Sequence, residues 1–167
     1  MKNYRIALTM FAPFALALSS LTHAEQDAER EARKGLVERG RYVVSTSGCN
    51  DCHTPGYPES GGALPMTDWL TGSNVGFRGP WGTTYPANLR YVINGLSEQQ
   101  WMGEAREPHR PPMPWFSLRD MSDRDLRAVY WFIRSLGKKG KPVPQYVPPG
   151  GQVNTLVIDF VPHAAAN

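Results

Sequence analysis

The chain has 167 residues and a formal net charge of +3, a length that fits one compact domain with short additional segments. Hydrophobic residues make up 41% of it, and the 16 glycines and 15 prolines indicate long loops and a thin apolar core. The sequence shows no stripe of basic residues interleaved with aromatic ones, so we expect no nucleic-acid partner.

Residues 1–24 have the pattern of a secretory signal peptide. Lys2 and Arg5 form a basic start, residues 6–18 carry no charge, and small residues follow up to Ala24. A membrane anchor is the alternative, but the apolar run is shorter than the ~20 residues that span a bilayer. We therefore expect cleavage after Ala24 and an exported protein without a membrane span. Cleavage would remove two basic and no acidic residues, lowering the net charge from +3 to +1.

Residues 27–45 predict the first helix of the mature chain. Its small and apolar positions follow the helical spacing i, i+1, i+4, i+7 and i+8: Leu36, Val37, Gly40, Val43 and Val44. Ser47 and Gly48 interrupt the helix just before the two cysteines of the chain.

Those cysteines lie in the motif Cys49-Asn50-Asp51-Cys52-His53. In a helical turn, Cys49 and Cys52 share one face, so their thiols can add to the two vinyl groups along one edge of a porphyrin. His53 then brings its imidazole under the iron. The motif predicts one covalently attached haem c, bound by both cysteines and ligated at its iron by His53.

Three alternatives explain the cysteines less well. A redox-active C-x-x-C would require a thioredoxin-like βαβ pattern, which the sequence lacks. A structural zinc site would need two more Cys or His at ligand spacing, and only His109 and His163 lie outside the signal peptide and the motif. A plain disulfide would leave His53 without a role.

Residues 54–88 are rich in Gly, Pro, Trp and Tyr and follow no sustained period, so we predict a long, functional loop. Ser97 and Gln100 have the spacing of a capping box, which predicts a short helix to about Arg106. The prolines between residues 107 and 116 exclude a helix there.

Met113 is the predicted second axial ligand of the iron. Pro112 and Pro114 flank it and stiffen the backbone, and a thioether ligand raises the potential of a haem. Met113 could instead be an ordinary core methionine, which the Pro-Met-Pro setting argues against. His109 is the rival ligand and would give a bis-His iron of lower potential.

A second cap at Ser122, with Met121 and Leu126 as a hydrophobic staple, predicts the clearest helix of the chain, ended by Gly137. One face of that helix is apolar: Leu126, Val129, Tyr130, Ile133 and Leu136.

Three lysines follow the helix: Lys138, Lys139 and Lys141. They could dock an acidic partner, but we prefer the interpretation that they complement the negative end of the helix dipole. Residues 142–151 predict a stiff Pro-rich tail, and residues 155–161 an extended strap against the body.

Several of these stretches together resemble a class I monohaem cytochrome c: Gly40-Arg41-Tyr42, the Cys49 to His53 motif, Pro112-Met113-Pro114-Trp115 and Tyr130-Trp131. More narrowly, residues 79–89 and 121–126 are similar to the cytochrome c domains of bacterial periplasmic dehydrogenase electron-transfer subunits. The likeness covers about residues 36–137.

The resemblance implies an all-α cytochrome c fold, in which the N- and C-terminal helices cross around one covalent haem. Gly40 would permit their close approach, against Tyr130 or Trp131. The resemblance divides the chain into a signal peptide (1–24), a cytochrome c domain (25–141) and a Pro-rich tail with the strap (142–167). Further residues become candidates for propionate contacts or haem walls: Arg78, Trp81, Tyr85, Asn88, Arg90 and Trp115.

The function so implied is single-electron transfer in the periplasm, without catalysis. The expected partners are redox proteins, a dehydrogenase as donor and a cytochrome or oxidase as acceptor. Many such subunits carry three haem motifs, whereas this chain has one. Two alternative functions would leave the second axial position of the iron open or weakly occupied. A peroxidase-like enzyme would use His109 with Arg106 or Arg110, and a ligand sensor would release Met113.

Overall fold

The computed structural model describes residues 12–162, with side chains from residue 23 onward. The chain forms two compact units, which divide between Gly35 and Leu36 and are described separately. Helix α1 (Ala12–Thr46) contributes to both and begins earlier than the predicted residue 27. In the first unit, ion pairs one turn apart support it, such as Asp27 with Arg30 at 3.4 Å.

The predicted signal peptide falls partly on residues 1–11, which lie outside the described residues. Residues 12–24 continue without a break into the rest of α1, so cleavage after Ala24 stays a prediction. Within the described part of the chain, no helix has the length and apolar character needed to cross a membrane.

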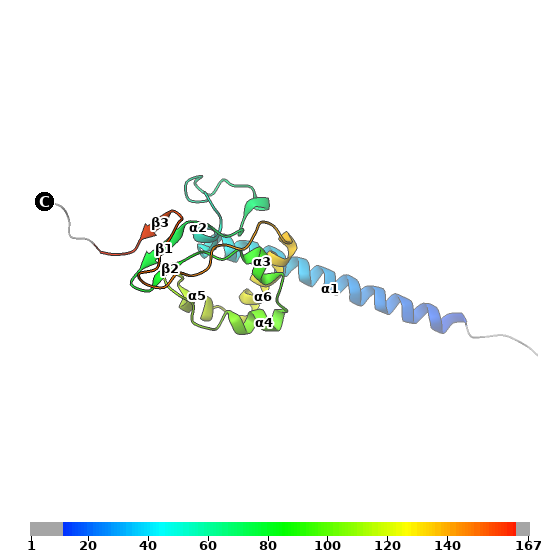
Figure 1. Ribbon diagram of the computed structural model, residues 1–167. Helices are drawn as coiled ribbons and strands as arrows, with labels where there is room; N and C mark the ends of the chain where they lie inside the picture. Colours follow the sequence, from blue (N-terminus) through cyan, green and yellow to red (C-terminus); the bar gives the residue numbers. More distant parts are fainter. Residues whose placement is uncertain (1–11, 163–167) are drawn as a thin grey trace, which may run out of the picture. The chain divides into compact units, whose positions relative to one another are not determined.

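The second unit contains the end of α1 and all remaining elements. The other helices are α2 (Cys49–His53), the 3-10 turn η1 (Met66–Asp68), α3 (Leu89–Ile93), α4 (Glu98–Glu104), α5 (Trp115–Arg119) and α6 (Asp123–Leu136). The strands are β1 (Gly76–Gly79), β2 (Gly82–Thr84) and β3 (Val157–Asp159). Figure 1 shows α3, α4 and α6 grouped together and the three strands side by side.

A helical core joins the end of α1 to α6, α3 and α4. Its fully buried apolar side chains include Val44, Leu70, Ile93, Leu126, Phe132 and Ile133. The Trp101 indole of α4 donates a hydrogen bond of 2.8 Å to the carbonyl of Leu126, and the Tyr130 hydroxyl donates one of 3.0 Å to that of Leu96. Buried aromatic side chains therefore carry their polar atoms to backbone acceptors on neighbouring elements.

Gly40 makes the close approach between α1 and α6 that the resemblance implies. A β-carbon at this position would lie 2.5 Å from the carbonyl carbon of Ala128 and 2.6 Å from the β-carbon of Phe132. The predicted partners, Tyr130 and Trp131, are wrong, because Ala128 and Phe132 lie four residues apart on the α6 face that meets α1.

The caps of helices α4 and α6 lie at the residues that the sequence predicted. Ser97 and Gln100 form the reciprocal capping box at the start of α4. Ser122 caps α6 by accepting from the Asp125 N–H, but the Asp125 carboxylate pairs with Arg39 at 2.8 Å instead of closing the box. Gly137 ends α6 with a φ of 68°, as predicted.

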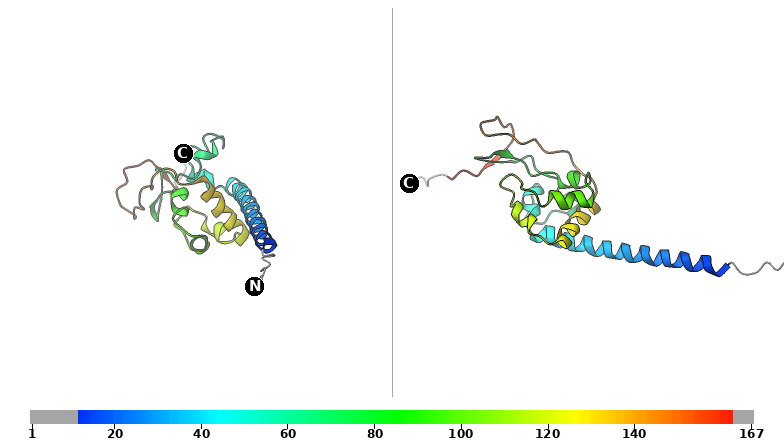
Figure 2. Two further views of the ribbon diagram at one scale, coloured as in Figure 1. Left: turned by 90° about the vertical axis from the view of Figure 1, so that its right-hand side faces the viewer. Right: turned by 90° about the horizontal axis from the view of Figure 1, so that it is seen from below.

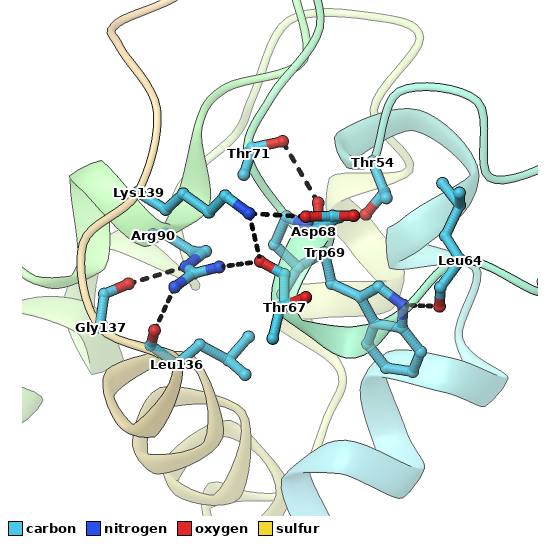
Figure 3. Close-up of polar contacts among 11 residues, drawn as sticks. Thr54, Leu64, Thr67, Asp68, Trp69, Thr71, Arg90, Leu136, Gly137 and Lys139 are labelled. Atoms are coloured by element: carbon cyan, nitrogen blue, oxygen red, sulfur yellow. Dashed lines mark hydrogen bonds and ion pairs between the residues drawn. The ribbon is translucent and has the colours of Figure 1, made fainter.

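The buried guanidinium of Arg90 ties the end of α6 to the segment around η1 (Figure 3). Its Nε donates to the Gly137 carbonyl at 2.7 Å and its Nη1 to the Thr67 carbonyl at 2.7 Å, while Nη2 donates to the Leu136 carbonyl. Lys139 reinforces the junction through the carboxylate of Asp68, 2.6 Å from its Nζ. The Arg90 donors thus satisfy carbonyls that the end of a helix leaves without partners.

A three-stranded sheet of order β2-β1-β3 accompanies the helices. Strand β1 pairs antiparallel with β2 and parallel with β3, where Gly76 lies opposite Val157. The all-α prediction describes the helical body and omits this sheet, because strands of three or four residues show too little alternation to be recognised. The predicted strap over residues 155–161 is extended and contains β3.

Candidate functional site

Helix α2 presents both cysteines of the motif as free thiols. It begins directly after Gly48, whose left-handed φ of 71° lets the chain turn from α1 into a new helix. Cys49 is partly buried and Cys52 is exposed. Burial raises the pKa of both thiols, that of Cys49 to about 11, so both are protonated at neutral pH.

A chain of hydrogen bonds fixes α2 to the loop that follows it. The Leu70 N–H donates to the Thr54 hydroxyl at 2.8 Å, and that hydroxyl donates to the Asn50 side-chain oxygen at 2.7 Å. The Gly72 N–H donates to the His53 carbonyl at 2.8 Å. Asn50 and Thr54 are buried, so these bonds hold the motif in one orientation without competition from water.

The ring of His53 is buried, and its position is set by one backbone group. Its Nδ1 donates a hydrogen bond of 2.8 Å to the Ala87 carbonyl. Since a carbonyl can only accept, this bond fixes the tautomer and leaves Nε2 with its lone pair. Burial lowers the pKa of His53; the bond to Ala87 acts in the opposite direction, and the electrostatic influence of His109 adds a smaller lowering. His53 therefore has the neutral, oriented imidazole of a metal ligand.

Asn88, the next residue after Ala87, holds this carbonyl in place. Its side-chain oxygen accepts from the Tyr91 N–H at 3.0 Å and caps α3, while its amide donates to the carbonyls of Lys139 and Lys141. These bonds and those of Arg90 engage the donors of both side chains with carbonyls of the chain, and their predicted contacts to the haem stay predictions.

Met113 is partly buried and packs against the helical core. Its carbonyl accepts from the Trp115 N–H at 2.8 Å, at the turn where α5 begins. The Trp115 ring lies 5.1 Å from the guanidinium carbon of Arg119. Upstream of Met113, the Thr84 hydroxyl donates to the Pro111 carbonyl at 2.7 Å, which ties the segment to strand β2.

Trp81 contains one of the two buried side-chain polar atoms without a hydrogen-bond partner among the described residues; the other is the amide nitrogen of Asn50. A buried indole N–H normally finds an acceptor. Tyr85, by contrast, is satisfied through the Thr155 hydroxyl at 2.8 Å. The orphaned indole of Trp81 fits an acceptor that the protein chain does not supply, as a haem carboxylate would.

The alternative metal site receives no support in the part of the chain that the structure describes. No group of three or more His, Cys, Asp or Glu that could hold an ion occurs there. His163, which the zinc alternative would need, lies outside the described residues. Free thiols, a neutral oriented histidine and an unsatisfied indole together fit a covalent haem.

Two groups that hold residues of this site in place could not be predicted from the sequence. The Ala87 carbonyl is a backbone atom, so no side-chain type marks it. Tyr146 donates from its hydroxyl to the Trp81 carbonyl at 2.7 Å and lies in a Pro-rich tail with no recognisable motif. Only the buried polar pair Asn50 and Thr54, four residues apart across the motif, gives a signal in the sequence.

Comparison with known proteins supports the resemblance. The chain is 27% identical over 132 residues to the cytochrome c subunit of alcohol dehydrogenase (quinone) from Gluconobacter oxydans, covering 71% of this chain and 25% of that protein. It is 30% identical over 132 residues to the gluconate 2-dehydrogenase cytochrome c subunit of Pantoea cypripedii, covering 71% and 27%. A nicotinate dehydrogenase subunit of Pseudomonas putida is 27% identical over 112 residues, which are 60% of this chain and 8% of that protein.

The chain thus spans about a quarter of the length of the two cytochrome c subunits. No protein-family model and no solved structure matches it. The likeness to the cytochrome c domains of dehydrogenase subunits, which the motifs predicted, is confirmed.

Proposed function

We propose that this homologue of dehydrogenase cytochrome c subunits carries single electrons on one covalent haem c in the periplasm. The donor is a dehydrogenase and the acceptor a respiratory cytochrome or oxidase. The observation that carries the proposal is the His53 ring, which the Ala87 carbonyl orients and which two free thiols precede in the same short helix. Two thiols and an adjacent imidazole at this spacing are the pattern of a haem c attachment site.

Each side chain of the motif has a defined task in this proposal. The Cys49 and Cys52 thiols add across the two vinyl groups and hold the cofactor even if an axial bond opens. His53 binds the iron through Nε2, and the bond from its Nδ1 to Ala87 makes the imidazole a better donor. When bound, the haem supplies an iron that changes oxidation state by one electron.

Met113 supplies the second axial ligand in this proposal. It lies in a segment that is fastened on both sides, through the Thr84 hydroxyl before it and the start of α5 after it. A thioether favours the ferrous state and raises the potential. With His53 and Met113 both on the iron, a substrate or small ligand could bind only by displacing one of them, which would suit an electron carrier.

Three aromatic residues complete the proposed site. The Trp81 indole donates to a propionate oxygen, because its N–H has no protein acceptor among the described residues. Tyr85 and Trp115 line the haem as apolar walls. The names of the relatives, subunits of alcohol and gluconate dehydrogenases, support a dehydrogenase as the source of electrons.

The proposal is tested by optical and electron paramagnetic resonance spectra of the purified, haem-loaded full chain. The oxidised protein is expected to be low-spin with a thioether-to-iron charge-transfer band, and Met113→Ala to abolish that band. Met121→Ala is the matched control, because Met121 is also partly buried and packs against the same core.

Two results would contradict the proposal. A high-spin oxidised iron that binds cyanide readily would favour the enzyme or sensor alternatives. A bis-histidine spectrum that His109→Ala removes would assign the distal position to His109 instead of Met113.

A further inference from the structure

Residues 142–162, the C-terminal arm, run from the end of α6 to the sheet (Figure 2). They meet the β1–β2 hairpin at two places. Val147 and Thr83 exchange backbone hydrogen bonds of 2.8 and 3.0 Å, and β3 pairs with β1. The hairpin is therefore bordered by the arm on both of its strands.

Several residues of the β1–β2 hairpin make specific contacts with the arm. Gly82 has a left-handed φ of 98°, and a β-carbon there would lie 3.1 Å from two backbone atoms of Pro148. On the other strand, the Arg78 guanidinium binds the Asp159 carboxylate through two bonds of 2.6 and 2.8 Å. The Phe160 ring lies 6.2 Å from that of Trp81. Backbone, charge and ring contacts thus all fix the arm in one register.

Hairpin and arm both contact the segment just before Met113. The Thr84 hydroxyl of β2 donates to the Pro111 carbonyl at 2.7 Å. The Arg110 guanidinium carbon lies 4.2 Å from the centre of the Tyr146 ring in the arm, a cation–π distance. The Tyr146 hydroxyl in turn donates to the Trp81 carbonyl at 2.7 Å. Tyr146 therefore joins the arm, the hairpin and the Met113 segment at one point.

These tethers act where the segment has little structure of its own. Residues 107–112 contain no helix or strand, and most of their side chains are exposed. Arg110 and Pro111 stand between His109 and Met113, the two side chains that compete for the iron. With a haem bound at His53, holding these two residues would set which of the two side chains reaches the iron, because only three residues separate His109 from Met113.

We propose that the C-terminal arm, acting through Tyr146 and the hairpin, is a positioning clamp that makes Met113 the distal ligand and keeps His109 off the iron. This inference rests on the proposed His53/Met113 ligation. It assigns a role to a part of the chain beyond residues 36–137, over which the resemblance to cytochromes c extends. Tyr146 acts through the segment it holds and does not itself touch the iron.

The test uses the haem-loaded full chain and the rate at which the oxidised protein binds cyanide, which requires Met113 to leave the iron. Tyr146→Ala removes the ring and the hydroxyl together, and the rate is expected to rise about tenfold. Tyr146→Phe keeps the ring and should raise it about threefold. Tyr91→Ala is the matched control, because it removes a similar contact, with Lys138 Nζ 5.8 Å from the ring centre, and should leave the rate unchanged.

A second readout tests ligand selection. Oxidised Tyr146→Ala is expected to show a bis-histidine signal in electron paramagnetic resonance, and the double variant Tyr146→Ala with His109→Ala should lose it. Thr84→Val removes the bond of 2.7 Å to the Pro111 carbonyl and a longer one of 3.4 Å to the Phe77 carbonyl. It should act in the same direction as Tyr146→Ala and replaces that variant if Tyr146→Ala does not fold.

The outcomes separate this inference from the proposed function. A wild-type protein without a thioether signature would overturn the Met113 assignment, and the clamp with it, before any variant is made. A normal wild-type spectrum with wild-type cyanide rates in Tyr146→Ala and Thr84→Val would overturn the clamp alone. Equal acceleration by Tyr91→Ala would also overturn it, because the effect would then be general loosening.

Discussion

The helical body and the hairpin with its arm bury their side chains to very different extents. In the body, Phe132 is 1% exposed and sits among side chains from several helices. In the arm, Phe160 is 44% exposed, and its ring lies tilted, 5.6 Å from that of Phe77, beside a small sheet. Stability and ligand placement are therefore divided in our proposal: the body holds the unit together, and the hairpin and arm position the Met113 segment.

The largest expected difference follows from this pair of phenylalanines. Phe132→Ala should lower the free energy of unfolding by about 3–5 kcal/mol, since it leaves a cavity in a closed core. Phe160→Ala should cost about 1 kcal/mol or less, because its ring is largely hydrated already. Urea denaturation of the two haem-loaded variants measures both values. Equal losses of unfolding free energy in the two variants would contradict the division of roles between the helical body and the arm.

Gly40→Ala probes the closest contact within the body. The added methyl would strike the backbone of Ala128 and the β-carbon of Phe132, so we expect a loss of about 1–3 kcal/mol in the free energy of unfolding.

Gly35→Ala is the control for that substitution, since nothing lies within 4 Å of a β-carbon there. It should be neutral or stabilise by up to about 1 kcal/mol through helix propensity. Similar thermal midpoints for the two variants would contradict the crossing of α1 and α6 at Gly40.

Hydrogen exchange sharpens the comparison without any substitution. The amides of Gly76 and Phe160, which donate across the β1–β3 pair at 2.8 and 2.7 Å, should exchange by local opening of the arm. Buried amides of α6 should exchange only when the whole unit unfolds. Native-state exchange followed by nuclear magnetic resonance measures this, and uniform protection would show that arm and body open together.

The smallest effect concerns acid stability where α1 meets α6. The hydrogen bond from Arg39 holds the pKa of Asp125 below its ordinary value of 3.8. Folding therefore favours the charged carboxylate, and its contribution is present above about pH 4 and lost as the pH falls through the lower, folded pKa. Asp125→Asn should make the free energy of unfolding less dependent on pH below about pH 4.

Urea titrations at several pH values measure that dependence. Added salt should weaken the wild-type effect, because the pair is partly exposed and open to screening. An unchanged pH profile in Asp125→Asn would show that other carboxylates account for the acid dependence.

The sequence predicted the helical body better than the C-terminal arm, because the signals for helices lie within a few neighbouring residues. The caps at Ser97 and Ser122 and the apolar face of α6 depend on residues within a few positions, and they lie where they were expected. The partner of Gly40 was predicted on the wrong part of α6, because spacing identifies a small residue but not the angle at which two helices meet.

The site was predictable only where side-chain chemistry marks it. Cys49, Cys52 and His53 are recognised by their type and spacing. The Ala87 carbonyl is not, and the sequence did not predict that Asn88 and Arg90 donate to carbonyls of the chain itself. A polar side chain beside a site is equally suited to a propionate or a carbonyl, and only the fold decides between them.

The parallel pairing of β1 with β3 also orders events in time. Arg78 and its partner Asp159 are 81 positions apart, so the last strand of the described chain closes the sheet. A chain emerges from the ribosome from its N-terminus. The residues of the helical body and both cysteines have therefore emerged before β3, so the pairing of β1 with β3 can form only after them.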